Sequence, residues 1–195
     1  AIGRMPRTIG HTGTKEPNSL MSEAPVEIAE YDPQWALEFI REQHIVSQAL
    51  GRWLVGPPEH IGSTAVPGLA AKPVIDIMAP VASLEASAAC VGAAGRIGYL
   101  YFPYKPQLMH WFCKPSPEVR THHLHLVPLN SRLWLERLAF RDALRADEAL
   151  RAEYRTLKLH LAALHRHDRE AYTDAKTPFV QRVLNSALGA DHTTT

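Results

Sequence analysis

The pattern of hydrophobic and polar positions changes along the chain, from strand-like in its first two thirds to helical in its last third. Alternation with a period of two is typical of half-buried strands. The predicted strands cover residues 26–31, 59–62, 74–81 and 98–102, and the two arms of a hairpin within residues 108–128. In the hairpin, two β-favouring runs flank the turn-forming sequence Lys-Pro-Ser-Pro-Glu. Because the arms of a hairpin are antiparallel, the sheet cannot be wholly parallel.

Two helices are predicted among these strands. Asp32 can cap a helix that has Pro33 at its first position, and this helix is expected to end at Gly51. Its inward residues are expected to be Trp35, Phe39, Ile40 and Val46. A second helix, rich in small residues, is predicted between Ser83 and Gly95.

In the last third of the chain, charged residues alternate with Leu, Ala and Trp at three- and four-residue spacing. This spacing predicts amphipathic helices beyond Asn130. Asp147 marks a break between two of them, and a final helical region follows Asp168, where Thr177-Pro178 either bends the helix or restarts it. The expected fold class is therefore α/β of the α+β kind, a mixed β-sheet flanked by helices with a helical C-terminal third.

Length favours one globular domain. A chain of 195 residues can bury a sizeable core. We place the domain at residues 26–188, with its helical part at residues 130–188. Residues 1–25 have no apolar period and are interpreted as a flexible leader, and residues 189–195 as a flexible tail.

Composition narrows the classes of partner. The 21 Lys and Arg residues nearly balance the 20 Asp and Glu residues, unlike in proteins that coat nucleic acid or a membrane surface. No apolar run reaches the roughly 18 residues of a membrane span. Cys90 and Cys113 show neither metal-site nor disulfide spacing. We therefore expect a cytoplasmic protein that binds small molecules, with neither nucleic acid nor a membrane as its partner.

The stretch HIGSTAVPGLAAKPVIDI, residues 60–77, carries the first candidate chemistry. Gly62 and Ser63 follow a strand and offer backbone amides and a hydroxyl where no Cβ blocks a close approach, which is typical of a phosphate site. Asp76 interrupts the next apolar strand, where a lone carboxylate is costly unless a metal ion, a cation or several donors meet it. Alternation places Asp76 and Met78 on one face of that strand.

Two histidines offer further chemistry. In RTHHLHLVP, residues 120–128, alternation places His123 and His125 on one face and the leucines on the core-facing side. If this strand neighbours that of Asp76, the three side chains form a mixed nitrogen and oxygen set, which suits Zn²⁺, Mn²⁺ or Fe²⁺ more than Mg²⁺. The imidazoles could instead act as general base and phosphate donor without a metal, or be hydrogen-bonded groups on a half-exposed face.

These motifs resemble the GrpB family. The resemblance rests on EHIGSTAVPGLAAKPVIDI and RTHHLHLVP, and on LAFRDALRA and REAYTDAKTPF in the helical third, in this order within residues 26–188. It implies the fold of the nucleotidyltransferase superfamily, a mixed sheet flanked by helices. It also implies a Gly-Ser turn for nucleotide phosphates and a strand-borne carboxylate for a divalent cation.

One position departs from the superfamily pattern. Twelve residues separate Ser63 from Asp76, as the pattern requires, but Met78 stands where a second carboxylate is normal. Mg²⁺ prefers hard oxygen ligands, so the thioether speaks against ordinary two-metal nucleotidyl transfer. The predicted cation is Mg²⁺ or Mn²⁺, with Zn²⁺ as the alternative. The candidate catalytic and metal-binding residues are Asp76, His123 and His125.

Other side chains could hold the rest of a nucleotide. The candidate nucleotide-binding residues are Gly62, Ser63, Lys72, Arg120, Lys158, Tyr172 and Lys176. In the helical third, Arg141 and the lysines would neutralise a triphosphate, and Tyr172 would stack on a base. The alternatives are a plain turn at Gly62, a salt bridge from Asp76 to Lys72 or Arg120, and a solvated helix face. His60 and His122 are expected to be packing residues, and His110 could join the histidine pair.

The sequence therefore predicts a nucleotidyltransferase-like protein that binds a nucleoside triphosphate and a divalent cation. It could transfer a nucleotidyl or phosphoryl group to a small acceptor. Two alternatives stay open. Met78 favours a non-catalytic binding or accessory module of the same fold, and the histidines favour a transition-metal enzyme built on Asp76.

Overall fold

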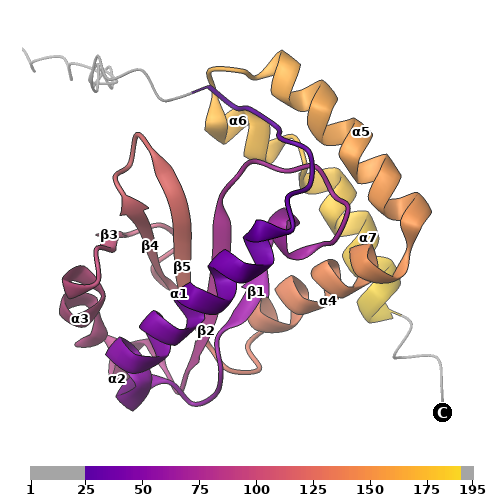
Figure 1. The fold of residues 1–195 in the computed structure, drawn as a ribbon. Helices are drawn as coiled ribbons and strands as arrows, with labels where there is room; N and C mark the ends of the chain where they lie inside the picture. The colour runs from indigo at the N-terminus through magenta and orange to yellow at the C-terminus, as the bar shows by residue number, and fades with distance from the viewer. Residues whose placement is uncertain (1–24, 190–195) are drawn as a thin grey trace, which may run out of the picture.

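The computed structural model describes residues 25–189, so the predicted leader and tail lie outside the described residues except at their boundaries. Its centre is a five-stranded sheet in the order β1-β2-β5-β4-β3 (Figure 1). The strands are β1 Glu59–Ile61, β2 Ile75–Val81, β3 Leu100–Phe102, β4 His110–Pro115 and β5 Arg120–Pro128. β2 and β5 are parallel, and all other neighbours are antiparallel. The predicted mixed sheet and the predicted hairpin are both confirmed.

Seven α-helices surround this sheet in the described part of the chain. They are α1 Gln34–Leu50, α2 Leu84–Ser87, α3 Cys90–Arg96, α4 Arg132–Ala146, α5 Glu148–Leu164, α6 Arg169–Asp174 and α7 Thr177–Gly189. Two 3₁₀ turns, Gly51–Trp53 and Ser63–Ala65, follow α1 and β1. In Figure 1, α4 to α7 gather on the side of the molecule opposite β3 and α3. The helical C-terminal third is confirmed. No helix among the described residues is long and apolar enough to cross a bilayer.

The predicted helix starts follow from side-chain caps. The Asp32 carboxylate accepts the backbone N–H of Gln34 at 2.8 Å before α1, and Ser83 Oγ accepts the N–H of Ala86 at 3.1 Å. The carboxylates of Asp147 and Asp168 each accept the N–H of the residue three positions later, both at 2.9 Å. These contacts satisfy amides that a helix leaves free at its first turn. Thr177-Pro178 restarts the helical region rather than bending it.

Three local expectations were wrong. The strand expected at residues 26–31 is a single bridge from Ala29 to Ala71, because it lacks a neighbour with which to form a longer ladder. The helix after Ser83 is divided into α2 and α3. Ile40 on α1 is 57% exposed, because it lies outside the stripe that faces the sheet.

The two faces of the sheet carry different side chains. On the face covered by α1 to α3, Ile75 and Ile77 of β2 and Leu124 of β5 are fully buried in the largest core cluster. On the other face, Met78 packs with Trp111 of β4 and Trp134 of α4 in a second cluster. The alternation predicted for β2 and β5 is therefore confirmed, and Asp76 lies on the second face beside Met78.

Candidate functional site

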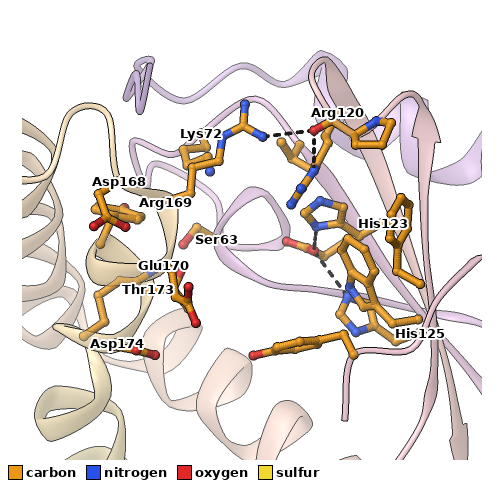
Figure 2. A pocket seen from close by; sticks show the side chains of 18 of the residues that line it. Ser63, Lys72, Arg120, His123, His125, Asp168, Arg169, Glu170, Thr173 and Asp174 are labelled. Carbon is orange, nitrogen blue, oxygen red and sulfur yellow. Dashed lines mark hydrogen bonds and ion pairs between the residues drawn. The ribbon is translucent and has the colours of Figure 1, made fainter. Parts of the chain in front are cut away.

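A cavity of about 1180 Å³ opens on the second face of the sheet. It is lined on one side by strands β2, β5 and β4 and on the other by α6. Figure 2 shows His123 and His125 on the strand side and Asp168, Glu170 and Asp174 on the helix side. The Gly-Ser turn after β1 contributes Ser63 to the same cavity.

Asp76 and the two histidines meet because β2 and β5 are parallel neighbours. Their register places Asp76 opposite His123 and Met78 opposite His125. Nδ1 of His123 lies 2.9 Å from Oδ1 of Asp76, and Nε2 of His125 lies 3.5 Å from the same oxygen (Figure 2). The predicted juxtaposition of the two strands is thus correct, and one carboxylate oxygen is shared by both imidazoles.

The Gly-Ser turn approaches the same carboxylate. Gly62 has a φ of +72°, and a Cβ atom built there would lie 2.5 Å from Oδ2 of Asp76. Only glycine therefore permits this turn and this contact together. The Thr64 side chain stabilises the turn. Its hydroxyl donates to the carbonyl of Val74 at 3.1 Å and lies 3.1 Å from Nε2 of His60.

The electrostatics favour an ionised acid and a neutral imidazole. Burial alone would raise the pKa of Asp76, but the hydrogen bonds and charges of His123 and His125 outweigh it and hold that pKa well below its usual range. Burial lowers the pKa of His125, although Asp76 acts in the opposite direction. At neutral pH, Asp76 is therefore a carboxylate and His125 is uncharged.

This donor set fits one metal ion. The ligand atoms of Asp76, His123 and His125 all lie within 4.8 Å of one another. Neighbouring ligands of an ion with bonds of about 2.1 Å lie about 3–3.5 Å apart, close to the distances between Asp76 and the two imidazoles. An ionised carboxylate and a neutral imidazole are also the forms that bind a metal. Two nitrogens and one oxygen suit Mn²⁺ or Zn²⁺ better than Mg²⁺.

A second ion has no comparable ligands at Met78. This residue is fully buried in the apolar cluster with Met109, Trp111 and Trp134. The thioether position is therefore part of the core.

The second nitrogen of each histidine has a different environment. Nδ1 of His125 lies 3.4 Å from the sulfur of Met109, and Nε2 of His123 is buried without a hydrogen-bond partner among the described residues.

The three predicted lysines line the same cavity as Ser63. Lys158 is 2% exposed, and its ammonium donates to the carbonyl of Ala70. Burial lowers the pKa of Lys158 to about 7, and the charge of Lys176 adds to this. Burial also lowers the pKa of Lys176 to about 8, with a contribution from Lys72. The charges of Lys72 and Lys158 thus both act on Lys176 within the cavity wall, and an anion there would relieve this repulsion.

Tyr172 has a different environment from the one expected. Its ring is 2% exposed and packs with Val26 and Leu161. The ammonium groups of Lys176 and Lys72 lie 4.1 and 5.8 Å from its centroid. The ring contacts the lysines and offers no open face to a base, so stacking by Tyr172 is not supported.

Two other expected contributions are also not supported. The Arg141 side chain does not line the cavity, because its guanidinium donates to Glu59 at 2.7 Å, to the carbonyl of His60 at 3.0 Å and to Asp142 at 2.7 Å. His110 lies on the other face of the sheet, with Nε2 3.0 Å from the carbonyl of Leu84. It does not join the histidine pair.

The structure also shows the surroundings of His60, His122 and Arg120. His60 is buried and stacks on Phe39 with 4.6 Å between ring centroids, as expected of a packing residue. His122 is partly buried, with Nδ1 2.9 Å from Oγ1 of Thr121. Arg120 lines the cavity, and its guanidinium carbon lies 5.5 Å from the centre of the Trp111 ring.

Sequence reasoning missed a large part of the cavity wall. These residues are the aromatics Phe102, Tyr104 and Trp111, the cations Arg137 and Arg169, and the acids Glu118, Asp168, Glu170 and Asp174. Arg169 ties α6 to the β4–β5 turn, because its guanidinium donates to the carbonyl of Glu118 at 3.2 Å. The alternation of aromatic residues before and within the hairpin was the available signal, but the strand order was needed to place them.

The comparisons with known proteins agree on a family. The sequence matches the GrpB protein family over residues 25–186. A UPF0157 protein of Deinococcus radiodurans is 33% identical over 182 residues, which cover 93% of each chain. A UPF0157 protein of Pseudomonas aeruginosa is 36% identical over 170 residues, which cover 85% of this chain and 69% of that protein.

A solved structure agrees as well. The crystal structure of the conserved protein GrpB from Enterococcus faecalis superimposes with a TM-score of 0.77 at 35% identity, covering 84% of this chain and 98% of that one. The residues that match the family, 25–186, include the sheet, the cavity and nearly all of the C-terminal helices. This chain belongs to the GrpB family.

Proposed function

We propose that the cavity binds a nucleoside triphosphate together with one divalent cation, and that the protein transfers a nucleotidyl or phosphoryl group to a small acceptor. The observation that carries this proposal is the convergence of three elements on one carboxylate. Oδ1 of Asp76 lies 2.9 Å from His123 and 3.5 Å from His125, while its Oδ2 faces the Gly62 turn.

The parts of the cavity suit the parts of this ligand. Asp76, His123 and His125 would hold the cation, with Mn²⁺ or Zn²⁺ favoured over Mg²⁺ by the donor set. The lysines of the cavity wall, Lys72, Lys158 and Lys176, would neutralise phosphate oxygens, and the Ser63 hydroxyl would donate to one of them. Arg120 would supply a further charge. The backbone after Gly62 allows a phosphate to approach without meeting a Cβ.

The transfer itself would need a nucleophile from the acceptor. An acceptor oxygen attacks phosphorus, the bond from phosphorus to the leaving phosphate oxygen breaks, and the acceptor proton passes to a base. A cation at Asp76 would offset the charge that develops on the phosphate oxygens. An imidazole nitrogen that does not bind the cation could accept the proton.

Binding is tested by calorimetry with ATP in the presence of MnCl₂. Ser63→Ala and Asp76→Asn should lose measurable ATP binding, because one removes a phosphate donor and the other a cation ligand. Ser186→Ala and Asp142→Asn are matched controls, since both residues are exposed and lie outside the cavity. Unchanged ATP affinity in both cavity variants would overturn the proposal.

A second candidate is a binding module without turnover, favoured by the burial of Met78 in the apolar cluster. Such a protein would hold the same ligand through the same residues. Incubation with ATP, Mn²⁺ and a panel of hydroxyl- and amine-bearing acceptors separates the two candidates. Release of pyrophosphate or ADP, followed by phosphorus NMR, supports transfer, and binding without any release supports the module.

A further inference from the structure

Besides Asp76 and the histidines, the cavity wall carries two chemically different groups of side chains. One group is the lysines Lys72, Lys158 and Lys176. The other is the aromatic residues Phe102, Tyr104 and Trp111. The aromatic group adjoins the histidines directly, because the ring centroids of Trp111 and His123 are 5.0 Å apart.

These three aromatic side chains form one supported surface. The Trp111 ring lies 5.9 Å from that of Phe102 and 6.1 Å from that of Tyr104, with edge-to-face angles of 64° and 68°. Such contacts hold rings in place. Trp111 is 9% exposed and acts as the support, whereas Tyr104 is 47% exposed at the cavity wall. An exposed aromatic ring held in this way can stack on a planar group at little cost in side-chain entropy.

We propose that Tyr104, supported by Trp111 and Phe102, is the stacking surface for the base of the bound nucleotide. This inference rests on the proposed function and names the part of the cavity that recognises the planar ring. In this assignment the lysines would hold the terminal phosphates, Asp76 the cation and Tyr104 the base. The contacts from Asp76 to His123, from His123 to Trp111 and from Trp111 to Tyr104 connect the cation position to the base position.

Two further observations favour Tyr104 over other rings. Tyr172, the only other tyrosine among the residues that line the cavity, is 2% exposed and contacts two lysine ammonium groups. By contrast, the neighbour over the Tyr104 ring is the Lys105 ammonium, 5.3 Å from the centroid. Lys105 is exposed, so a base could displace its ammonium group from the ring.

The test compares ATP with inorganic tripolyphosphate, each titrated calorimetrically in the presence of MnCl₂. Tyr104→Ala should weaken ATP binding by about tenfold or more, the range found for loss of one stacked base, and should leave tripolyphosphate affinity unchanged. Tyr104→Phe should bind ATP as the unaltered protein does. Tyr101→Ala is the matched control, because Tyr101 is 37% exposed but contacts His110 and Phe112 on the other face of the sheet.

Each outcome is decisive. If the unaltered protein binds neither ATP nor tripolyphosphate, the proposed function is overturned and the base site with it. If both ligands bind and Tyr104→Ala weakens neither, or weakens both equally, the base site alone is overturned. Selective loss of ATP affinity in Tyr104→Ala, with Tyr101→Ala unchanged, supports it.

Discussion

Gly62 and Asp76 are in such close contact that a single added carbon would separate them. A Cβ on residue 62 would lie 2.5 Å from Oδ2 and 3.1 Å from Cγ of the aspartate. The turn after β1 and the carboxylate of β2 therefore hold each other in position, and the Gly-Ser turn and Asp76 form one unit.

Gly62→Ala should consequently impair binding as well as stability. The positive φ of the residue alone should cost about 1–3 kcal/mol, and the collision should turn the Asp76 carboxylate away from the histidines. Gly68→Ala is the control, because Gly68 also has a positive φ, +78°, but a Cβ there meets nothing within 4 Å. Urea denaturation should show a loss in both variants, and calorimetry with Mn²⁺ should show weaker binding only for Gly62→Ala. Equal Mn²⁺ affinities would contradict the coupling.

The histidine pair should determine cation binding. His123→Ala and His125→Ala should each weaken Mn²⁺ and Zn²⁺ binding. The loss should exceed the roughly 10–100-fold decrease in affinity that follows removal of a residue hydrogen-bonded to a metal ligand. The stoichiometry of the unaltered protein should be one ion per chain, measured by elemental analysis after dialysis. His160→Ala, on the exposed side of α5, should bind as the unaltered protein does. Retention of the ion in both histidine variants would show that they serve only as hydrogen-bond donors to Asp76.

Met78→Asp should not create a second cation site. The side chain is fully buried among apolar residues, so a carboxylate there should cost about 3 kcal/mol or more. Met78→Leu should keep most of the stability because it conserves volume and polarity. Thermal denaturation with and without Mn²⁺ measures the effect. Recovery of the Asp variant by Mn²⁺ would instead indicate a scaffold that still accepts two ions.

Stability should rise with pH between about 7 and 10 because of Lys158. Burial lowers the pKa of this lysine from 10.5 to about 7, so within that window the unfolded chain binds the proton and the folded chain does not. The group then adds stability as pH increases, by at most about 1.4 kcal/mol per pH unit. Below pH 7 both states are protonated and the contribution is constant. Lys158→Met should flatten the profile from urea denaturation, whereas the exposed Lys105→Met should leave it unchanged.

Anion binding should have the opposite pH dependence. Lys158 and Lys176, with pKa values lowered to about 7 and about 8, lose their charges as pH rises from 6.5 to 9. Tripolyphosphate affinity should therefore decrease over this range, as measured by calorimetry in buffers of equal ionic strength. Lys176→Arg should make the decrease smaller, because the guanidinium stays charged. A pH-independent affinity in the unaltered protein would exclude the two lysines from the binding site.

Alternation along single strands was enough to predict which residues share a face. It placed Asp76 with Met78 and His123 with His125, and the structure has both pairs on the second face of the sheet. The cap at Asp32 and the helix break at Asp147 were also predictable, since each depends on residues within one turn. Local physics therefore accounts for most of the elements and for which side chains share a face, whereas the pairing of β2 with β5 brings Asp76 to the histidines.

Contacts across elements could not be predicted in this way. Whether Tyr172 faces the cavity or the core depends on how α6 packs against α5, and its ring is buried by residues from both ends of the domain. Arg141 was expected to bind phosphates, but its guanidinium donates to Glu59 and to the backbone carbonyl of His60. The aromatic pattern around Tyr104 could not be interpreted from sequence, because only the pairing of the edge strand β3 with β4 brings this residue beside Trp111.

The parallel pairing of β2 with β5 has a consequence for local unfolding of the sheet. Asp76 and His123 are 47 residues apart in sequence, and α2, α3, β3 and β4 all lie between the two paired strands in the chain. An ion bound by residues of both strands would cross-link β2 and β5 and oppose their separation. Amide hydrogens of residues 75–81 and 120–128 should then exchange more slowly in the loaded protein, while those of α1 keep their rates.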